Sequence, residues 1–131
     1  MWLINDKWCT NVTVHRRFCS ADLELLHMEC RPHYLPTEIN LINLIPVYCV
    51  PEAANKICQE IISDIIDQCC MKHPESATIV AGDFNVQLIH LNQYVDFNTR
   101  KNKKLDLCYS NIPNAYKSYK LPSIGASDHC T

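Results

Sequence analysis

The sequence has little glycine, no cysteine pairs of the kind that bind zinc and no long apolar run. Only Gly82 and Gly125 occur in 131 residues, and no repeat, low-complexity stretch or flexible linker interrupts the chain. We therefore expect one compact unit. None of the nine cysteines belongs to a C-x-x-C pair, which argues against a zinc site. No apolar run approaches the ~18 residues that a membrane span needs, so we expect no membrane partner.

A strong charge imbalance is also missing, because the formal net charge is -2. A basic domain would have indicated nucleic-acid binding, but a metal ion can supply the positive charge in a nuclease, so the question stays open. No secretory signal is visible, since only three apolar residues separate Met1 from the polar stretch that begins at Asn5. We expect an intracellular protein with reduced thiols and no disulfide-linked partner.

Apolar and β-branched segments predict several strands. Hydrophobic residues make up 47% of the chain and charged residues 20%, a balance that allows a core to be buried. The run 39–49 is almost wholly apolar, which indicates a strand covered on both faces. The expected strands are 12–18, 23–30, 39–49, 77–81, 105–110 and 115–121.

The clearest element is an amphipathic helix between two of these strands. Apolar pairs recur four apart through residues 57–70, with polar residues between them. Pro51 and Glu52 suit the start of this helix, and Pro74 should end it at or before His73. The order strand, long helix, strand is the pattern of a crossover unit whose helix covers one face of a sheet. The chain is therefore predicted to belong to the α/β class.

The sharpest local motif is Gly82-Asp83-Phe84-Asn85, directly after the expected strand 77–81. If the chain stays extended, Asp83 and Asn85 point roughly the same way. The carboxylate can accept a proton from water, and the amide can donate to a phosphate oxygen. Taken alone, such residues at a strand end are more often turn formers.

Two further motifs combine acids with a histidine. Asp106 lies in an apolar strand, where a carboxylate is costly unless it is paired, and His129 is a candidate partner. Ser127-Asp128-His129 can ligate a metal or stabilise a phosphoryl transition state. In isolation the second motif is more often a plain loop, and Asp106 can equally face solvent at a strand edge.

Tyr48 and a basic cluster complete the candidates. Tyr48 ends the apolar run 39–49, and its hydroxyl can donate to phosphate, although packing is the more common role. Arg100, Lys101, Lys103 and Lys104 form the densest group of cations. They can contact DNA phosphates or simply be a solvated loop.

These features together, in this order, resemble the endonuclease/exonuclease/phosphatase family. Its members include DNase I-like nucleases, abasic-site endonucleases and the endonuclease domain of LINE-type retrotransposons. The chain resembles most the retrotransposon branch found in vertebrates, especially fishes, and the similarity covers nearly the whole chain. The stretches that carry it are 18–24, 30–36, 79–85 and 105–111.

The resemblance implies a four-layer α-β-β-α sandwich of the DNase I-like type and Mg²⁺-dependent hydrolysis of DNA phosphodiester bonds. It implies that Asp83 activates the water and also meets the metal, with Asn85 orienting water and phosphate. Tyr48 would contact phosphate, and His129, oriented by Asp106, would stabilise the transition state. Asp128 would contact the metal or the leaving group. Phosphoryl transfer needs each of these contributions.

The family also has parts for which this sequence shows no match. Its principal metal ligand is a glutamate on an early strand that should precede Met1, and its last core strand should follow Thr131. We therefore expect residues 1–131 to be a single partial domain that binds Mg²⁺ weakly and is inactive or nearly so. A retained activity would place the protein in the nucleus. The alternatives are a non-catalytic nucleic-acid or protein interaction module on the same scaffold, and a phosphoesterase of this fold with a non-DNA substrate.

Overall fold

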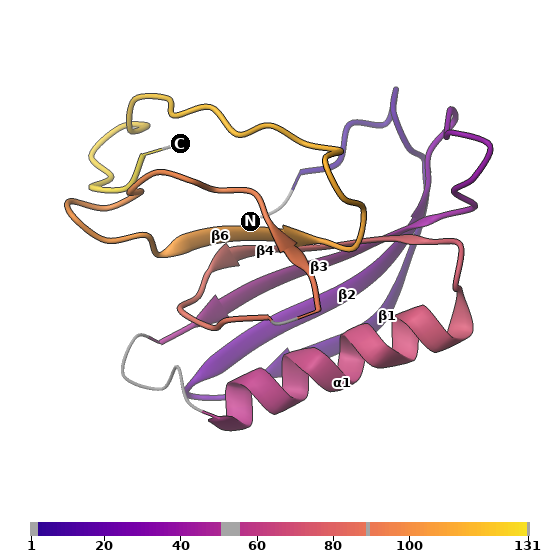
Figure 1. Ribbon diagram of the computed structural model, residues 1–131, viewed down its shortest axis with the longest axis horizontal. Coiled ribbons are helices and arrows are strands. Elements are labelled where there is room, and N and C mark those ends of the chain that lie inside the picture. The colour runs from indigo at the N-terminus through magenta and orange to yellow at the C-terminus, as the bar shows by residue number, and fades with distance from the viewer. Residues whose placement is uncertain (1–2, 51–55, 89, 131) are drawn as a thin grey trace.

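One mixed β-sheet and one helix make up the regular structure of the residues that the structure describes (Figure 1). The structure is a computed structural model, and it describes residues 3–50, 56–88 and 90–130. The six strands lie in the order β1-β2-β3-β4-β6-β5. The elements are β1 (Asn11–Cys19), β2 (Leu23–Arg31), β3 (Ile42–Cys49), α1 (Lys56–Lys72), β4 (Ala77–Asp83), β5 (Asn92–Gln93) and β6 (Asp106–Ser110).

The crossover predicted from the sequence is present. Strands β3 and β4 pair in parallel, and α1 connects them, whereas every other pair of neighbouring strands is antiparallel. The prediction of an α/β class is confirmed. The predicted helix is confirmed through its end at Lys72, while the start expected near Pro51 and Glu52 lies outside the described residues.

The larger core lies between α1 and one face of the sheet (Figure 1). The apolar stripe of α1 supplies five buried residues to it: Cys58, Ile62, Ile65, Ile66 and Cys69. Alternate residues of the strands, such as Leu25, Val47 and Val80, meet this stripe. Burying a large aliphatic side chain contributes ~1.5–3 kcal/mol, so this face provides most of the apolar stabilisation.

The opposite face of the sheet is covered only in part. Cys9, Met28, Cys30 and Leu44 form a second, smaller cluster there. At the end of β3, however, Tyr48 remains 45% exposed. The prediction that the run 39–49 is covered on both faces is therefore wrong for its last residues, and the strand itself begins only at Ile42.

The predicted strand 115–121 is also wrong, because that segment has no regular structure. The outer edge of β6 is already paired with β5, a two-residue strand that is too short to leave a sequence signal. The last two residues of β6, Tyr109 and Ser110, are therefore not open to pairing with residues 115–121. Among the described residues, no helix has the length and apolar character to cross a membrane. All nine cysteines are free thiols.

Candidate functional site

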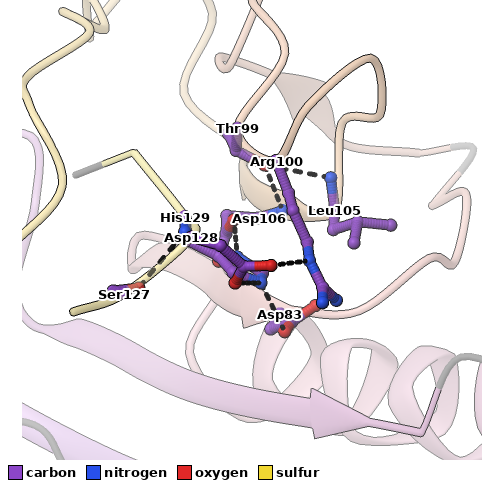
Figure 2. A network of polar contacts seen from close by, with 8 residues as sticks. All are labelled: Asp83, Thr99, Arg100, Leu105, Asp106, Ser127, Asp128 and His129. Atoms are coloured by element: carbon purple, nitrogen blue, oxygen red, sulfur yellow. Dashed lines mark hydrogen bonds and ion pairs between the residues drawn. The ribbon is translucent and has the colours of Figure 1, made fainter.

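Two carboxylates and an imidazole converge at one end of strands β4 and β6 (Figure 2). Asp83 is the last residue of β4, Asp106 is the first residue of β6, and His129 lies in the C-terminal segment. One possible ligand atom from each lies within 4.8 Å of the others. We call these three residues the site cluster. Among the described residues, this is the one group of three or more acids, cysteines or histidines close enough to share a metal ion.

Strand register brings the two carboxylates together. Asp83 is the antiparallel partner of Asp106 on β6 and the parallel partner of Tyr48 on β3. Gly82 lets β3 and β4 come close at this point, because a Cβ on it would overlap the carbonyl oxygen of Val47. Its φ of +150° is also unfavourable for other residues. The glycine of the motif therefore positions the aspartate that follows it.

Asp106 holds the ring of His129. The Nδ1 atom of His129 lies 2.7 Å from Asp106 Oδ2, so the expected pairing of these two residues is confirmed. A carboxylate at this distance favours a proton on Nδ1 and leaves Nε2 facing the other acids. The Nε2 atom lies 3.9 Å from Asp83 Oδ2 and 3.7 Å from Asp128 Oδ1.

Thr99 connects the elements that carry this pair. The buried Thr99 hydroxyl oxygen accepts hydrogen bonds from the backbone N–H groups of Leu105 and Asp106, each at 3.1 Å (Figure 2). Its carbonyl oxygen accepts a hydrogen bond from the N–H of Cys130 at 2.7 Å. The loop before β6 and the C-terminal segment are thereby fixed to each other. No sequence pattern singles out Thr99, because a lone threonine in a loop has no distinguishing neighbours.

Asp128 and Arg100 form an ion pair beside the site cluster. Arg100 Nε donates to Asp128 Oδ2 at 2.7 Å, and this hydrogen bond holds the pKa of the Asp128 carboxyl below its usual value. Asp128 was expected at the metal and Arg100 at DNA phosphate. The structure brings the two residues to each other, and Asp128 lies outside the three-residue group that can share an ion.

The electrostatics of the site are dominated by two neighbouring acids. Burial raises the pKa of Asp83 above its usual value, and the charge of Asp106 raises it further, while His129 and Arg100 act in the opposite direction. The Asp83 carboxylate is therefore more basic than an ordinary aspartate. A bound cation would remove the repulsion between the two acids.

Tyr48 and Asn85 lie near the site cluster without belonging to it. Tyr48 lines a groove of about 600 Å³ on the open face of the sheet, together with Gly82 and Asp83. Asn85 follows β4 and is exposed, with the fully buried Phe84 between it and Asp83. Within the described residues, the Tyr48 hydroxyl and the Asn85 amide have no hydrogen-bond partner, so both are available to a ligand.

The predicted basic cluster forms a tight turn. The backbones of Arg100 and Lys103 hydrogen-bond in both directions, at 2.9 and 3.1 Å, and Lys101 adopts a φ of +49° between them. Lys101 and Lys103 are exposed, whereas Lys104 is partly buried. Only part of the basic cluster therefore has a freely accessible side chain.

Comparisons of the chain with family models, curated proteins and solved structures found no match. The resemblance to the endonuclease/exonuclease/phosphatase family stays a prediction. Function is therefore inferred from the geometry of the site cluster.

Proposed function

We propose that the site cluster binds a divalent metal ion and hydrolyses phosphodiester bonds in DNA. The observation that carries this proposal is the convergence of Asp83, Asp106 and His129 within 4.8 Å, with two acids side by side. Phosphoryl transfer needs an activated water and positive charge on the phosphate oxygens, and this set of groups is suited to provide both.

The donor atoms fit a hard divalent cation. Mg²⁺ is commonly held by one or two carboxylates plus waters and substrate phosphate, and the site cluster offers the carboxylates of Asp83 and Asp106. Mn²⁺ accepts the same oxygens and an imidazole. Such an ion, when bound, acts as a Lewis acid and lowers the pKa of water. Because Asp106 Oδ2 is already hydrogen-bonded to His129 Nδ1, the affinity for Mg²⁺ is expected to be weak.

The residues of the chain divide the remaining work. Asp83, whose pKa is raised by burial and by Asp106, is suited to take a proton from the attacking water. His129, oriented through Nδ1 by Asp106, directs Nε2 toward the reacting groups and donates to phosphate when protonated. Tyr48 and Asn85 are the unpartnered donors nearby among the described residues, and we assign them to phosphate contacts.

This function implies a place for the sheet in a larger architecture. We assign the sheet and α1 to two layers of an α-β-β-α sandwich. The partly open face of the sheet, where Tyr48 is exposed, is the one that would pack on a second sheet. Action on chromosomal DNA would place the protein in the nucleus.

Metal titration tests the first half of the proposal. We expect Mg²⁺ or Mn²⁺ to raise the thermal midpoint of the wild type, by ~1 kcal/mol of stability at several times the dissociation constant. Asp83→Asn and Asp106→Asn should abolish the shift. The matched control is Asp67→Asn, an exposed acid on α1, which should keep it. If neither metal changes the thermal midpoint of the wild type, the proposal is contradicted and a non-catalytic interaction module is favoured.

A nicking assay tests the second half. With supercoiled plasmid and Mg²⁺ or Mn²⁺, we expect at most slow cutting, because metal binding is expected to be weak, and any cutting should disappear with EDTA and in Asp83→Ala. A panel of phosphomonoesters and inositol phosphates run in parallel separates DNA from other phosphoesters. If those compounds are hydrolysed and the plasmid is not cut, DNA is not the substrate and a phosphoesterase acting on small molecules is favoured.

A further inference from the structure

Residues 116–120 form an exposed ridge of tyrosine and lysine that packs against Tyr94. Two of its residues make this contact: the Tyr116 ring packs edge-on against Tyr94, with centroids 5.1 Å apart, and the Ser118 hydroxyl donates to the Tyr94 carbonyl at 2.7 Å. The Lys117 ammonium lies 5.4 Å from the centroid of the Tyr119 ring. We call residues 116–120 the tyrosine–lysine ridge.

The Tyr119 ring is open to solvent although its backbone is held in place. Tyr119 is 68% exposed, so most of the ring is available besides the face that Lys117 covers. The backbone around it belongs to no strand, yet the contacts of Tyr116 and Ser118 with Tyr94 restrain it. A restrained, exposed aromatic ring makes a stacking surface at a low cost in conformational entropy.

The ridge belongs to a basic stretch of a chain whose net charge is -2. Residues 96–128 contain six of the 12 lysines and arginines and three of the 14 acids, of which Asp128 pairs with Arg100 and Asp96 contacts Ser118. The remaining residues are correspondingly acidic. The six cations are Arg100, Lys101, Lys103, Lys104, Lys117 and Lys120. A local excess of this kind is the electrostatic footprint of a polyanion partner.

The basic stretch extends from the far end of β6 to the site cluster. Tyr94, which Tyr116 and Ser118 contact, donates hydrogen bonds to the carbonyls of Cys108 and Ile112, whereas the site cluster includes Asp106, the first residue of β6. In Figure 1 the segment 111–125 and the loop between β5 and β6 both run above the strands. The contacts of residues 116 and 118 with Tyr94 join the two segments at one point, and the Thr99–Cys130 hydrogen bond joins them at another. The ridge then leads along the chain into Asp128 and His129.

We infer that the tyrosine–lysine ridge binds an unpaired nucleic-acid strand, with a base stacked on Tyr119 and phosphates held by Lys117 and Lys120. An unpaired strand would then be the form of substrate that the proposed phosphodiesterase acts on. Cleavage of the bound strand rests on that proposed function. Base faces are hidden in a duplex and open in a single strand, so an exposed ring favours unpaired nucleotides. A protein partner fits less well, because lysine is depleted at protein interfaces.

Binding of oligothymidine in EDTA tests the stacking. The probe is a fluorescent strand of about 12 nucleotides, within the ~4–16 that single-strand sites cover, and anisotropy reports its affinity. Tyr119→Ala should weaken binding by on the order of tenfold, and Tyr119→Phe should restore it, since the ring alone stacks. The matched control is Tyr34→Ala, which removes a 91% exposed tyrosine elsewhere on the surface and should change nothing.

Salt dependence tests the phosphate contacts. Each of Lys117→Gln and Lys120→Gln should weaken binding and reduce the slope of log affinity against log salt by ~0.7, the value for one phosphate contact on a single strand. Lys56→Gln, at an exposed lysine of α1, should leave the slope unchanged.

Three results would overturn the inference: equal affinities for Tyr119→Ala and Tyr34→Ala, duplex DNA bound as tightly as the single strand, or unaltered salt slopes. The measurement is made without metal, so it is independent of catalysis. If the protein binds the single strand but is not stabilised by metal, only the proposed function is contradicted. If it binds metal but not the single strand, only the inference about the tyrosine–lysine ridge is contradicted.

Discussion

Two clusters in this molecule combine carboxylates with histidines, and they differ in how the acids are compensated. On the helix side of the sheet, Glu29 of β2 contacts one ammonium group and two imidazoles: Lys72 Nζ at 3.0 Å, His15 Nε2 at 3.0 Å and His73 Nε2 at 3.3 Å. The His73 contact lacks hydrogen-bond geometry. We call these four residues the helix-side cluster. The site cluster instead has two acids around one histidine.

The pKa shifts of the central acids have opposite signs. Burial raises the pKa of Glu29, but hydrogen bonds from Lys72 and His15 outweigh it and the net pKa is lowered. Burial and the charge of Asp106 raise the pKa of Asp83. The helix-side cluster thus contains its own counter-charge and joins β1, β2 and α1. At the site cluster, His129 and Arg100 compensate the two acids only in part and the pKa of Asp83 stays raised, which is the expected condition of a site that takes a cation from solution.

The largest effect is expected at Gly82, which shapes the site cluster but not the helix-side cluster. Gly82→Ala should lower the free energy of unfolding by about 3 kcal/mol, because the new Cβ overlaps the Val47 carbonyl and the backbone cannot move without separating β3 from β4. Urea unfolding measures it. Gly125→Ala is the control: its φ is +64° but nothing lies within 4 Å, so only ~1 kcal/mol of backbone strain is expected. Equal losses in the two variants would contradict the close approach.

Glu29→Gln should have the next largest effect. Only Glu29 itself is buried, and the partly exposed Lys72 and His15 can be solvated once their acid is gone, so the loss of unfolding free energy should be about 1 kcal/mol. Glu24→Gln changes an exposed acid on the opposite face of the same strand and should cost little. If the two variants unfold alike in urea, the helix-side cluster is not a structural tie.

The pH dependence of stability should separate the clusters by sign. Because the pKa of Asp83 is raised in the folded protein, ionisation of Asp83 lowers the free energy of unfolding. This loss is absent at a pH below the usual aspartate pKa and complete at a pH above the raised pKa. Asp83→Asn should therefore be more stable than the wild type near neutral pH, and the gain should vanish in acid. The lowered pKa of Glu29 gives stability that is present above the usual glutamate pKa and lost as pH falls through the lowered one.

Glu29→Gln should therefore be less stable than the wild type near neutral pH, and Asp83→Asn should be more stable. Both differences in unfolding free energy should become smaller as the pH falls. Urea unfolding of the three proteins across the acid range measures both. A stability deficit for Asp83→Asn at neutral pH would show that Asp83 is compensated within the chain, as Glu29 is.

The smallest effect is on thiol reactivity in α1. Burial raises the pKa of Cys69 to about 11, and its sulfur lies 3.3 Å from His27 Nε2, so it should react with iodoacetamide only when the helix opens. Glu29→Gln should speed labelling of Cys69 severalfold without changing the exposed Cys19, as followed by mass spectrometry. Unchanged labelling of Cys69 would mean that Glu29 does not hold α1 against the sheet.

Local sequence patterns predicted those helices and strands that can pack against any apolar surface and do not need one particular partner. The stripe of α1 needs only an apolar surface, and the strand, helix, strand order favours a parallel crossover, so both were predictable. The pairing of Asp106 with His129 was a sound expectation because an acid in an apolar strand needs a partner. The prediction of a strand at 115–121 was wrong. A local sequence pattern can indicate an extended segment, but it cannot show whether a neighbouring strand has an edge available for pairing.

The sequence by itself determined the class of fold, the helix stripe, and the residue types able to bind a cation, because these depend on composition and on short-range periodicity. Only the tertiary structure decided which of those residues meet. Strand register put Asp83 beside Asp106, Thr99 fixed the segment that carries His129, and Arg100 paired with Asp128. Such contacts join residues that lie far apart along the chain, and their geometry depends on the packing of the whole sheet.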